Sequence, residues 1–286
     1  LIDQEGGRVQ RFGEPFFGLP PPRALGHLYD EEAAAGLAAA RSFGWLMAAE
    51  LRAVGVDLSF APVVDLDLGL AQVIGNRALH HHPAAVTQLA RAFVSGTAEA
   101  GMAATAKHFP THAGVRSDSH TELAEDHRDY VELLDELAIY RKLIHTGLHS
   151  IMAAHVMFPK LDPLPASLSR WWIETQLRGE LGYNGAVVSD DMSMAGASVA
   201  GSAAERVRAA LEAGGDLVLL CNAPNDVPEV LESLKGYANP ASQLRLMRLR
   251  GRSVPGWDAL HESARWRSAY AELEALRTRP KLELEA

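Results

Sequence analysis

The sequence predicts an α/β fold built around a parallel sheet, and three observations support this prediction. Short apolar segments alternate with longer helical segments along all 286 residues. The short segments are hydrophobic throughout, which is typical of strands buried on both faces of a parallel sheet. No glycine fingerprint of the dinucleotide or P-loop type follows any of them, which disfavours a Rossmann fold. A βα-barrel and another doubly wound sheet remain as candidates.

Six strands and six intervening helices are expected, followed by an amphipathic helical tail over about 240–279. The strands are LID (1–3), VDLSFAPVVD (56–65), AATAKHF (103–109), SIMAAHVMF (150–158), GAVVSD (185–190) and DLVLLCN (216–222). The helices are expected at about 30–54, 83–101, 129–145, 169–180, 202–213 and 226–236. Asp30 is predicted to cap the first helix and Gly55 to end it. Pro83 suits the first turn of the second helix, so the His80–His82 run is read as its entry.

Polar side chains follow nearly every predicted strand, and this favours a TIM-like (β/α)8 barrel. They are Asp3, Glu5, Asp65, Asp67, Lys107, His108, His155, Asp190, Asp191 and Asn222. In such a barrel the carboxyl ends of the strands meet at one mouth, where the active site lies. Six strands are fewer than the eight of a closed barrel. We therefore expect one domain over residues 1–286 that lacks one or two N-terminal βα units, with C-terminal helices from about residue 240.

Composition excludes several classes of protein. The formal charge is −9 and no basic run is present, so we expect no nucleic-acid partner. The single cysteine, Cys221, rules out a disulfide within the chain and suits a reducing compartment, so a cytoplasmic location is expected. No apolar run approaches about 18 residues, so we expect no membrane span. We also expect a monomer.

Two constellations contain groups able to do acid–base or nucleophilic chemistry. Asp190 and Asp191 end a predicted strand, and adjacent strand residues point to opposite sides, so one carboxylate should face the pocket while the other caps the next turn. Asp118 lies two residues before His120 and could hold one ring nitrogen, which leaves the other for proton transfer. The alternative for this second pair is a solvated surface loop.

Further basic and imidazole groups lie in the same stretch of sequence. Lys107 and His108 end a predicted strand, and the lysine could donate to hydroxyl or anionic groups or form an ion pair with a neighbouring acid. His108, His112 and His120 could together bind zinc, but FPTHAG is not helical, so the four-residue spacing does not bring His108 and His112 together. We therefore expect no metal and no other cofactor.

Six segments in order resemble the β-N-acetylglucosaminidases of glycoside hydrolase family 3, the bacterial enzymes of cell-wall recycling. They are IDQEGGRVQRF (2–12), FAPVVDLD (60–67), IGNR (74–77), KHFPTHAGVRSDSH (107–120), AHVMFP (154–159) and VVSDDMSMAGA (187–197). The resemblance implies a βα-barrel and a retaining exo-enzyme that removes terminal β-linked N-acetylglucosamine from muropeptides through a covalent glycosyl-enzyme.

The resemblance also implies roles for individual residues. Asp190 is implied as the nucleophile, His120 as the general acid and then base, and Asp118 as the group that orients it. The implied sugar-binding residues are Asp3, Arg11, Arg77, Lys107 and His108. Most retaining glycosidases use two carboxylates, and here a histidine takes the place of one.

The chain departs from the family pattern at Thr111 and Ala113, where glycine is common, and we expect these positions to need unusual backbone angles. Asn76 stands where an acid is common. Three alternatives stay open: a phosphorylase or a hydrolase of another β-sugar on the same scaffold, a metal-dependent barrel hydrolase, and a non-catalytic sugar-binding module.

Overall fold

The computed structural model describes residues 1–116 and 123–279. Asp118 and His120, the predicted proton-handling pair, lie outside this range. Among the described residues, none of the helices is both long enough and apolar enough to cross a membrane.

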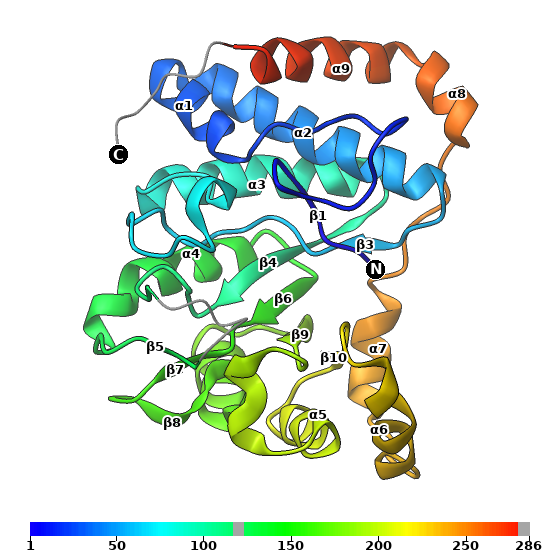
Figure 1. Cartoon of the computed structure of the whole chain (residues 1–286). Helices are drawn as coiled ribbons and strands as arrows, with labels where there is room; N and C mark the ends of the chain where they lie inside the picture. The colour runs from blue at the N-terminus through cyan, green and yellow to red at the C-terminus, as the bar shows by residue number, and fades with distance from the viewer. Residues whose placement is uncertain (117–122, 280–286) are drawn as a thin grey trace.

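A curled parallel sheet forms the centre of the fold, as predicted (Figure 1). Its strand order is β10–β9–β6–β4–β3. The strands are β3 (Leu58–Ser59), β4 (Ala103–Phe109), β6 (Ser150–Ala153), β9 (Ala186–Asp191) and β10 (Leu217–Leu219). Ile2 adds a parallel bridge to Ser59 at the outer edge of β3, so all six predicted strand segments contribute to one sheet.

Two predicted strands differ from the structure. The segment 56–65 forms only β3 and a bridge from Val63 to Lys107, because Pro62 has no N–H to donate to a strand ladder. The segment 150–158 divides at His155 into β6 and β7 (Val156–Phe158). β7 leaves the central sheet and pairs with β5 (Ala124–Glu125) and β8 (Asp162–Pro165). A further hairpin joins β1 (Gln4–Gly6) to β2 (Val9–Gln10).

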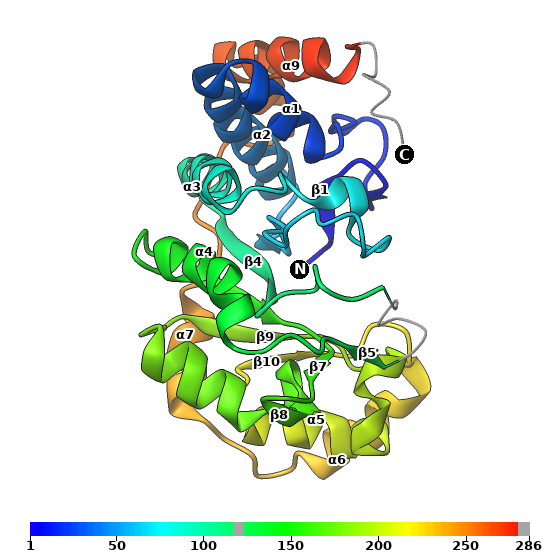
Figure 2. The ribbon, with the colours of Figure 1, turned by 90° about the vertical axis from the view of Figure 1, so that its left-hand side faces the viewer.

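Helices cover the outside of the sheet in an arc, as Figure 2 shows for α2, α3, α4 and α5. The helices of this layer are α1 (Arg23–Glu31), α2 (Ala33–Ala53), α3 (Pro83–Glu99), α4 (Leu134–Ile144), α5 (Ala203–Glu212) and α6 (Val227–Ser233). Short 3₁₀ helices lie at η1 (Gly75–Arg77), η2 (Val131–Leu133), η3 (Ala166–Leu168), η5 (Ala195–Ala200) and η6 (Pro224–Asp226). The helix predicted at 169–180 forms as a π-helix, η4 (Trp171–Glu180).

The predicted N-cap at Asp30 is wrong. Asp30 lies inside α1, and Glu32, which is extended, precedes α2. The two helices meet closely, because a side chain on Gly36 would lie 2.5 Å from Cα of Tyr29. The Asp30 carboxylate instead lies 2.7 Å from Nε2 of His80. This contact ties the end of α1 to the segment before α3.

The other predicted helix ends are confirmed. After α2, Gly55 has a φ of +86°, and the N–H of Val56 donates to the carbonyl of Leu51 at 2.9 Å, which is a Schellman motif. Pro83 is the first residue of α3, and the side chain of His82 accepts a hydrogen bond from the N–H of Ala84. The three consecutive histidines therefore lead into a helix, as expected.

Between residue 240 and the end of the described chain at residue 279 lie three helices: α7 (Pro240–Met247), α8 (Trp257–Glu262) and α9 (Ala264–Arg277). The amphipathic tail is thus helical but interrupted between α7 and α8. Figure 1 shows α9 lying beside α1 and α2, near the other end of the sequence. The extent of the single domain, 1–286, stays a prediction.

Candidate active site

Four predicted site residues lie at the carboxyl ends of strands of the central sheet. Nζ of Lys107, on β4, lies 2.9 Å from Oδ1 of Asp3, which follows the Ile2 bridge. His108 is the next residue of β4, and Asp190 lies near the end of β9. Lys107 and His108 are both buried and are joined by a cis peptide bond.

A buried carboxylate, Glu5, joins two of the predicted sugar-binding cations. Its two oxygens accept hydrogen bonds from Nε and Nη2 of Arg77 at 2.8 and 2.9 Å, and Oε1 also lies 2.5 Å from Nζ of Lys107. Burial opposes the charge of Glu5, but Lys107 and Arg77 outweigh it and lower the pKa to about 2. All three groups are therefore charged near neutral pH.

The carboxylate of Glu5 also affects the pKa values of Arg77 and Lys107. Burial opposes their charges, but Glu5 outweighs it and raises the pKa of both Arg77 and Lys107, with help from Asp3 at Lys107. Nη1 of Arg77 also donates to the carbonyl of Val73 at 2.9 Å. The cation heads are thus held in fixed positions before any sugar binds.

His108 is oriented by a second buried carboxylate, Asp65. Its Nδ1 lies 2.7 Å from Oδ2 of Asp65, whose other oxygen accepts from the N–H of His112 at 2.7 Å. Burial opposes the charge of Asp65, yet His108 outweighs it and lowers the pKa of the carboxyl. With Nδ1 facing Asp65, the Nε2 of His108 is left for another partner.

Asp191, the second acid of the doublet at the end of β9, is bonded to fixed parts of the scaffold. The Asp191 carboxylate accepts hydrogen bonds from the N–H of Ser193 at 3.0 Å, the N–H of Cys221 at 2.9 Å and the amide of Asn222 at 2.9 Å. It therefore fixes the turn after β9 and the chain that leaves β10. Asp191 acts on the scaffold.

Asp190 is partly exposed, and among the described residues its carboxylate accepts one hydrogen bond, from the N–H of Asp191 at 2.9 Å. Burial opposes its charge, but His155, His108 and Lys107 outweigh it and lower the pKa to about 2. An ionised oxygen at this place can act as a nucleophile or stabilise a developing cation.

Arg11 lies apart from the buried cluster. Its side chain is exposed, and its backbone N–H donates to Oε1 of Gln4 at 2.8 Å. The negative groups Asp3 and Asp190 and the positive Arg11 all influence the thiol of Cys221, whose pKa is raised to about 11 by burial and by Asp191. Arg11 follows β2, outside the central sheet.

His155 is bonded to the backbone at the end of β9. It is fully buried, with Nδ1 2.6 Å from the hydroxyl of Ser167 and Nε2 3.0 Å from the carbonyl of Asp191. Burial lowers its pKa, which favours the neutral ring. His155 thereby connects the end of β6 to the end of β9.

Glu5, Asp65 and His155 lie at predicted strand ends, but the sequence indicates no role for them. Their position marks them as candidates for the site. Their hydrogen-bond partners lie far away in the sequence, so no local pattern identifies these partners. The expectation of unusual backbone angles at Thr111 and Ala113 is wrong, because neither residue has a positive φ. The Thr111 hydroxyl instead accepts from the N–H of Ala113 at 3.0 Å and closes the turn.

Within residues 1–116 and 123–279, no group of three potential ligands could hold a metal ion. The expectation that the spacing keeps His108 and His112 apart is wrong. Asp65 binds both residues, and their rings are in contact, with centroids 6.1 Å apart. The third member of the alternative zinc set, His120, lies outside the described residues. Nδ1 of His108 already faces Asp65.

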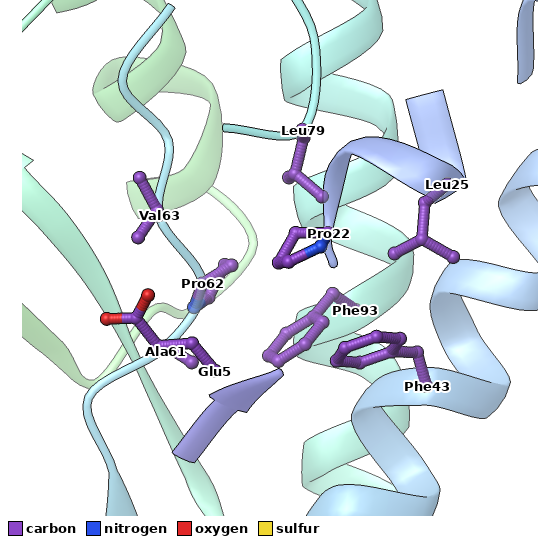
Figure 3. Close-up of a pocket in the computed structure, with 9 residues that line it drawn as sticks. All are labelled: Glu5, Pro22, Leu25, Phe43, Ala61, Pro62, Val63, Leu79 and Phe93. Atoms are coloured by element: carbon purple, nitrogen blue, oxygen red, sulfur yellow. The ribbon is translucent and has the colours of Figure 1, made fainter. Parts of the chain in front are cut away.

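A small cavity beside Glu5 is separate from the site. It has a volume of about 10 Å³, room for about one water molecule. Apart from Glu5, its lining is apolar and comes from single residues of α1, α2 and α3 and from the segments around Pro62 and Leu79. Figure 3 shows the Glu5 carboxylate directed away from the rings of Phe43 and Phe93. The cavity therefore offers no polar groups for a sugar apart from Glu5, which is already paired.

Comparison with known proteins gives a consistent result. The profile described as "Glycosyl hydrolase family 3 N terminal domain" matches residues 1–249. A Beta-hexosaminidase of Alkalilimnicola ehrlichii is 50% identical over 99% of this chain and 82% of its own length. One of Thioalkalivibrio sulfidiphilus is 48% identical over the same shares. The crystal structure of NagZ from Neisseria gonorrhoeae in complex with N-trifluoroacetyl-D-glucosamine matches with a TM-score of 0.91 and 39% identity, over 97% of this chain and 81% of that one.

Proposed function

We propose that this chain, which belongs to glycosyl hydrolase family 3 and is a β-N-acetylglucosaminidase, uses Asp190 as its nucleophile. The observation that carries the proposal is the contrast at the end of β9. Asp191 is saturated by fixed donors, whereas Asp190 is ionised and partly accessible. A carboxylate in that state can attack the anomeric carbon of a sugar placed above it.

The chemistry divides into two displacements. In the first, an oxygen of Asp190 forms a bond to the anomeric carbon while the bond from that carbon to the leaving oxygen breaks. The leaving oxygen takes a proton. In the second, water gives a proton to a base and attacks the same carbon, which releases Asp190. Two inversions at one carbon retain the β configuration.

We assign the proton transfers to His120, with Asp118 orienting its ring. The basis is the match of DSHTE to the family motif, since both residues lie outside the described part of the chain. A histidinium can protonate the leaving oxygen, and the neutral ring that results can then accept a proton from water. A neutral imidazole is also not repelled by the charge of Asp190.

The sugar would be held by Asp3, Arg11, Arg77, Lys107 and His108. Asp3 is partly exposed, and its second oxygen is available to accept from a hydroxyl while the first holds Lys107. His108 presents Nε2, because Asp65 takes Nδ1. Arg77 and Lys107 are fixed by Glu5, so donor positions are set in advance, and such preorganisation favours binding of the transition state.

For the substrate, we propose muropeptides with a terminal β-linked N-acetylglucosamine, cleaved from the end by a monomeric enzyme of the cytoplasm. The support is the similarity to Beta-hexosaminidases and to NagZ, together with a single cysteine, which is exposed. The one-domain organisation over 1–286 belongs to the same proposal.

Trapping the covalent intermediate tests reaction class and nucleophile together. An activated 5-fluoro glycoside of N-acetylglucosamine, which keeps the 2-acetamido group, should label the intact enzyme with one sugar. Peptide mapping should then place the label on Asp190. A label on another residue would contradict the assignment, and no label at all would favour a non-catalytic binding module.

The phosphorylase alternative has its own test. Turnover of an aryl β-N-acetylglucosaminide should be the same in phosphate and in a non-nucleophilic buffer, with free N-acetylglucosamine as the product in both. Formation of a sugar 1-phosphate would instead identify phosphate as the acceptor. Loss of activity on treatment with a chelator would favour the metal-dependent alternative.

A further inference from the structure

The loop that carries Arg11 is fixed on its strand side by one glutamine. Oε1 of Gln4, on β1, accepts hydrogen bonds from the backbone N–H groups of Arg11 and Phe12 at 2.8 and 3.1 Å. Gln10 adds a second set of contacts, since its side chain donates to the carbonyls of Phe12 and Phe17. The Arg11 side chain itself is exposed, so its reach depends on where this loop is held.

On its outer side, the loop meets the C-terminal helices through a continuous series of ring contacts. Phe12 stacks on Phe16 with centroids 4.5 Å apart and planes within 11°. Phe16 packs on Trp257 of α8 at 4.6 Å. Trp257 then contacts His261, and His261 contacts Trp266 of α9, each with centroids 4.3 Å apart. Ring pairs at these separations attract one another.

Glu50, on α2, joins the same two parts through one buried carboxylate. Its Oε2 accepts from the N–H of Phe17 at 2.9 Å, and its Oε1 accepts from the indole N–H of Trp266 at 3.0 Å. Nε2 of His261 lies 3.5 Å from Oε1. A buried carboxylate needs such donors, so the loop and α9 share one anchor in the helical layer.

We propose that α8 and α9 form a positioning element for Arg11 in the sugar site, with Trp257 and Trp266 as its positioning residues. This inference deepens the proposed function and rests on the contact of Arg11 with the sugar. Helices that lie more than 240 residues away in sequence would thereby determine where the guanidinium stands. A displacement of about 1 Å in such a group can reduce activity by about 100-fold, so a fixed loop matters for binding.

The test measures N-acetylglucosamine binding to the full chain by titration calorimetry. We expect Trp257→Ala to weaken binding about 5- to 20-fold and Trp257→Phe, which keeps a ring on Phe16, to stay within about 2-fold of wild type. In an Arg11→Ala background, Trp257→Ala should weaken N-acetylglucosamine binding by less than about a further 2-fold, because the guanidinium that Trp257 positions is absent. Trp171→Ala, the matched control on η4, should bind as wild type.

Three results would overturn the inference: unchanged binding in Trp257→Ala, effects of Trp257→Ala and Arg11→Ala that add fully, or wild-type binding by Arg11→Ala. Equilibrium binding does not need the nucleophile. The binding results therefore test the positioning of Arg11, whereas the sugar-trapping experiment tests the assignment of Asp190. If Trp257→Ala does not fold, Trp266→Phe removes the indole N–H that bonds Glu50 while it keeps an aromatic ring at this position. It should then speed hydrogen exchange at the Phe17 amide and weaken binding; an unchanged exchange rate and affinity would refute the inference.

Discussion

Two groups of charged side chains lie at the strand ends, and they differ in how their hydrogen-bonding capacity is used. In the cluster around β4, Glu5 and Asp65 have both oxygens occupied by cations, imidazole or backbone N–H groups. At the end of β9, the carboxylate of Asp190 accepts a single hydrogen bond among the described residues. A saturated carboxylate can hold other groups in place but has little left to offer a substrate. An ionised carboxylate with remaining capacity is suited to react.

The largest effects are expected from substituting Asp190 and Asp191 separately, because one should change activity and the other stability. Asp190→Ala should lower kcat for an aryl β-N-acetylglucosaminide by about 10⁴-fold with little loss of stability, because it removes a reacting group and few fixed contacts. Asp191→Asn should instead lower the free energy of unfolding by about 1–3 kcal/mol, since its buried donors lose a charged acceptor. Steady-state kinetics and thermal unfolding of both variants would decide the matter. Near-wild-type turnover by Asp190→Ala would refute the nucleophile assignment.

The second prediction concerns the group assigned to proton transfer. His120→Ala should reduce kcat/KM for substrates with a poor leaving group by about 10²–10³-fold, because only these need a proton on the leaving oxygen. Aryl substrates should lose far less in the first displacement. Comparing a disaccharide with a nitrophenyl glycoside measures the difference, and equal losses on both would argue against the acid role.

The separation of reacting and positioning carboxylates could be predicted from the sequence only in part. The run of polar residues after apolar strands indicated the barrel mouth, and the SDD doublet indicated that one acid faces the pocket. The pairing of Glu5 with Arg77, 72 positions away, depends on how β1 and η1 come together, which no local pattern encodes. The same holds for the bond between Glu50 and Trp266, 216 positions apart. Local capping signals predicted Gly55 and Pro83 correctly, whereas Asp30 failed because packing of Gly36 on Tyr29 decides where α1 ends.

The third prediction concerns Glu5, a carboxylate whose two oxygens are both occupied. Glu5→Ala should lower the free energy of unfolding by about 3–5 kcal/mol at neutral pH, because it leaves Arg77 and Lys107 buried without their shared carboxylate. Glu5→Gln keeps the shape and should lose less stability, but it should raise KM as the cation heads shift. Urea unfolding with kinetics on both variants measures the two effects, and an unchanged KM in Glu5→Gln would count against a positioning role.

The acid dependence of stability follows from the sign of the same pKa shift. The folded pKa of Glu5, about 2, lies below the ordinary carboxyl value of 4.5. Its contribution is therefore fully present above about pH 4.5 and is lost as the pH falls towards 2. Between those values the wild type should lose more stability than Glu5→Gln, which has no carboxyl to protonate. If the free energy of unfolding fell equally with pH in the wild type and in Glu5→Gln, Glu5 would have its ordinary pKa in the folded protein.

A reference for these effects comes from the contact between α2 and α3. In the layer outside the sheet, α2 and α3 approach so closely that a Cβ on Gly44 would lie 2.3 Å from the carbonyl oxygen of Phe93. Gly44→Ala should therefore force the helices apart and lower the free energy of unfolding by about 1–3 kcal/mol, while kcat changes little. Gly13→Ala is the matched control, because nothing lies within 4 Å of its added methyl group. If Gly44→Ala lowered kcat as much as Asp190→Ala, loss of activity would report general disruption of the fold, and the distinction between reacting and positioning carboxylates would need evidence other than mutant turnover.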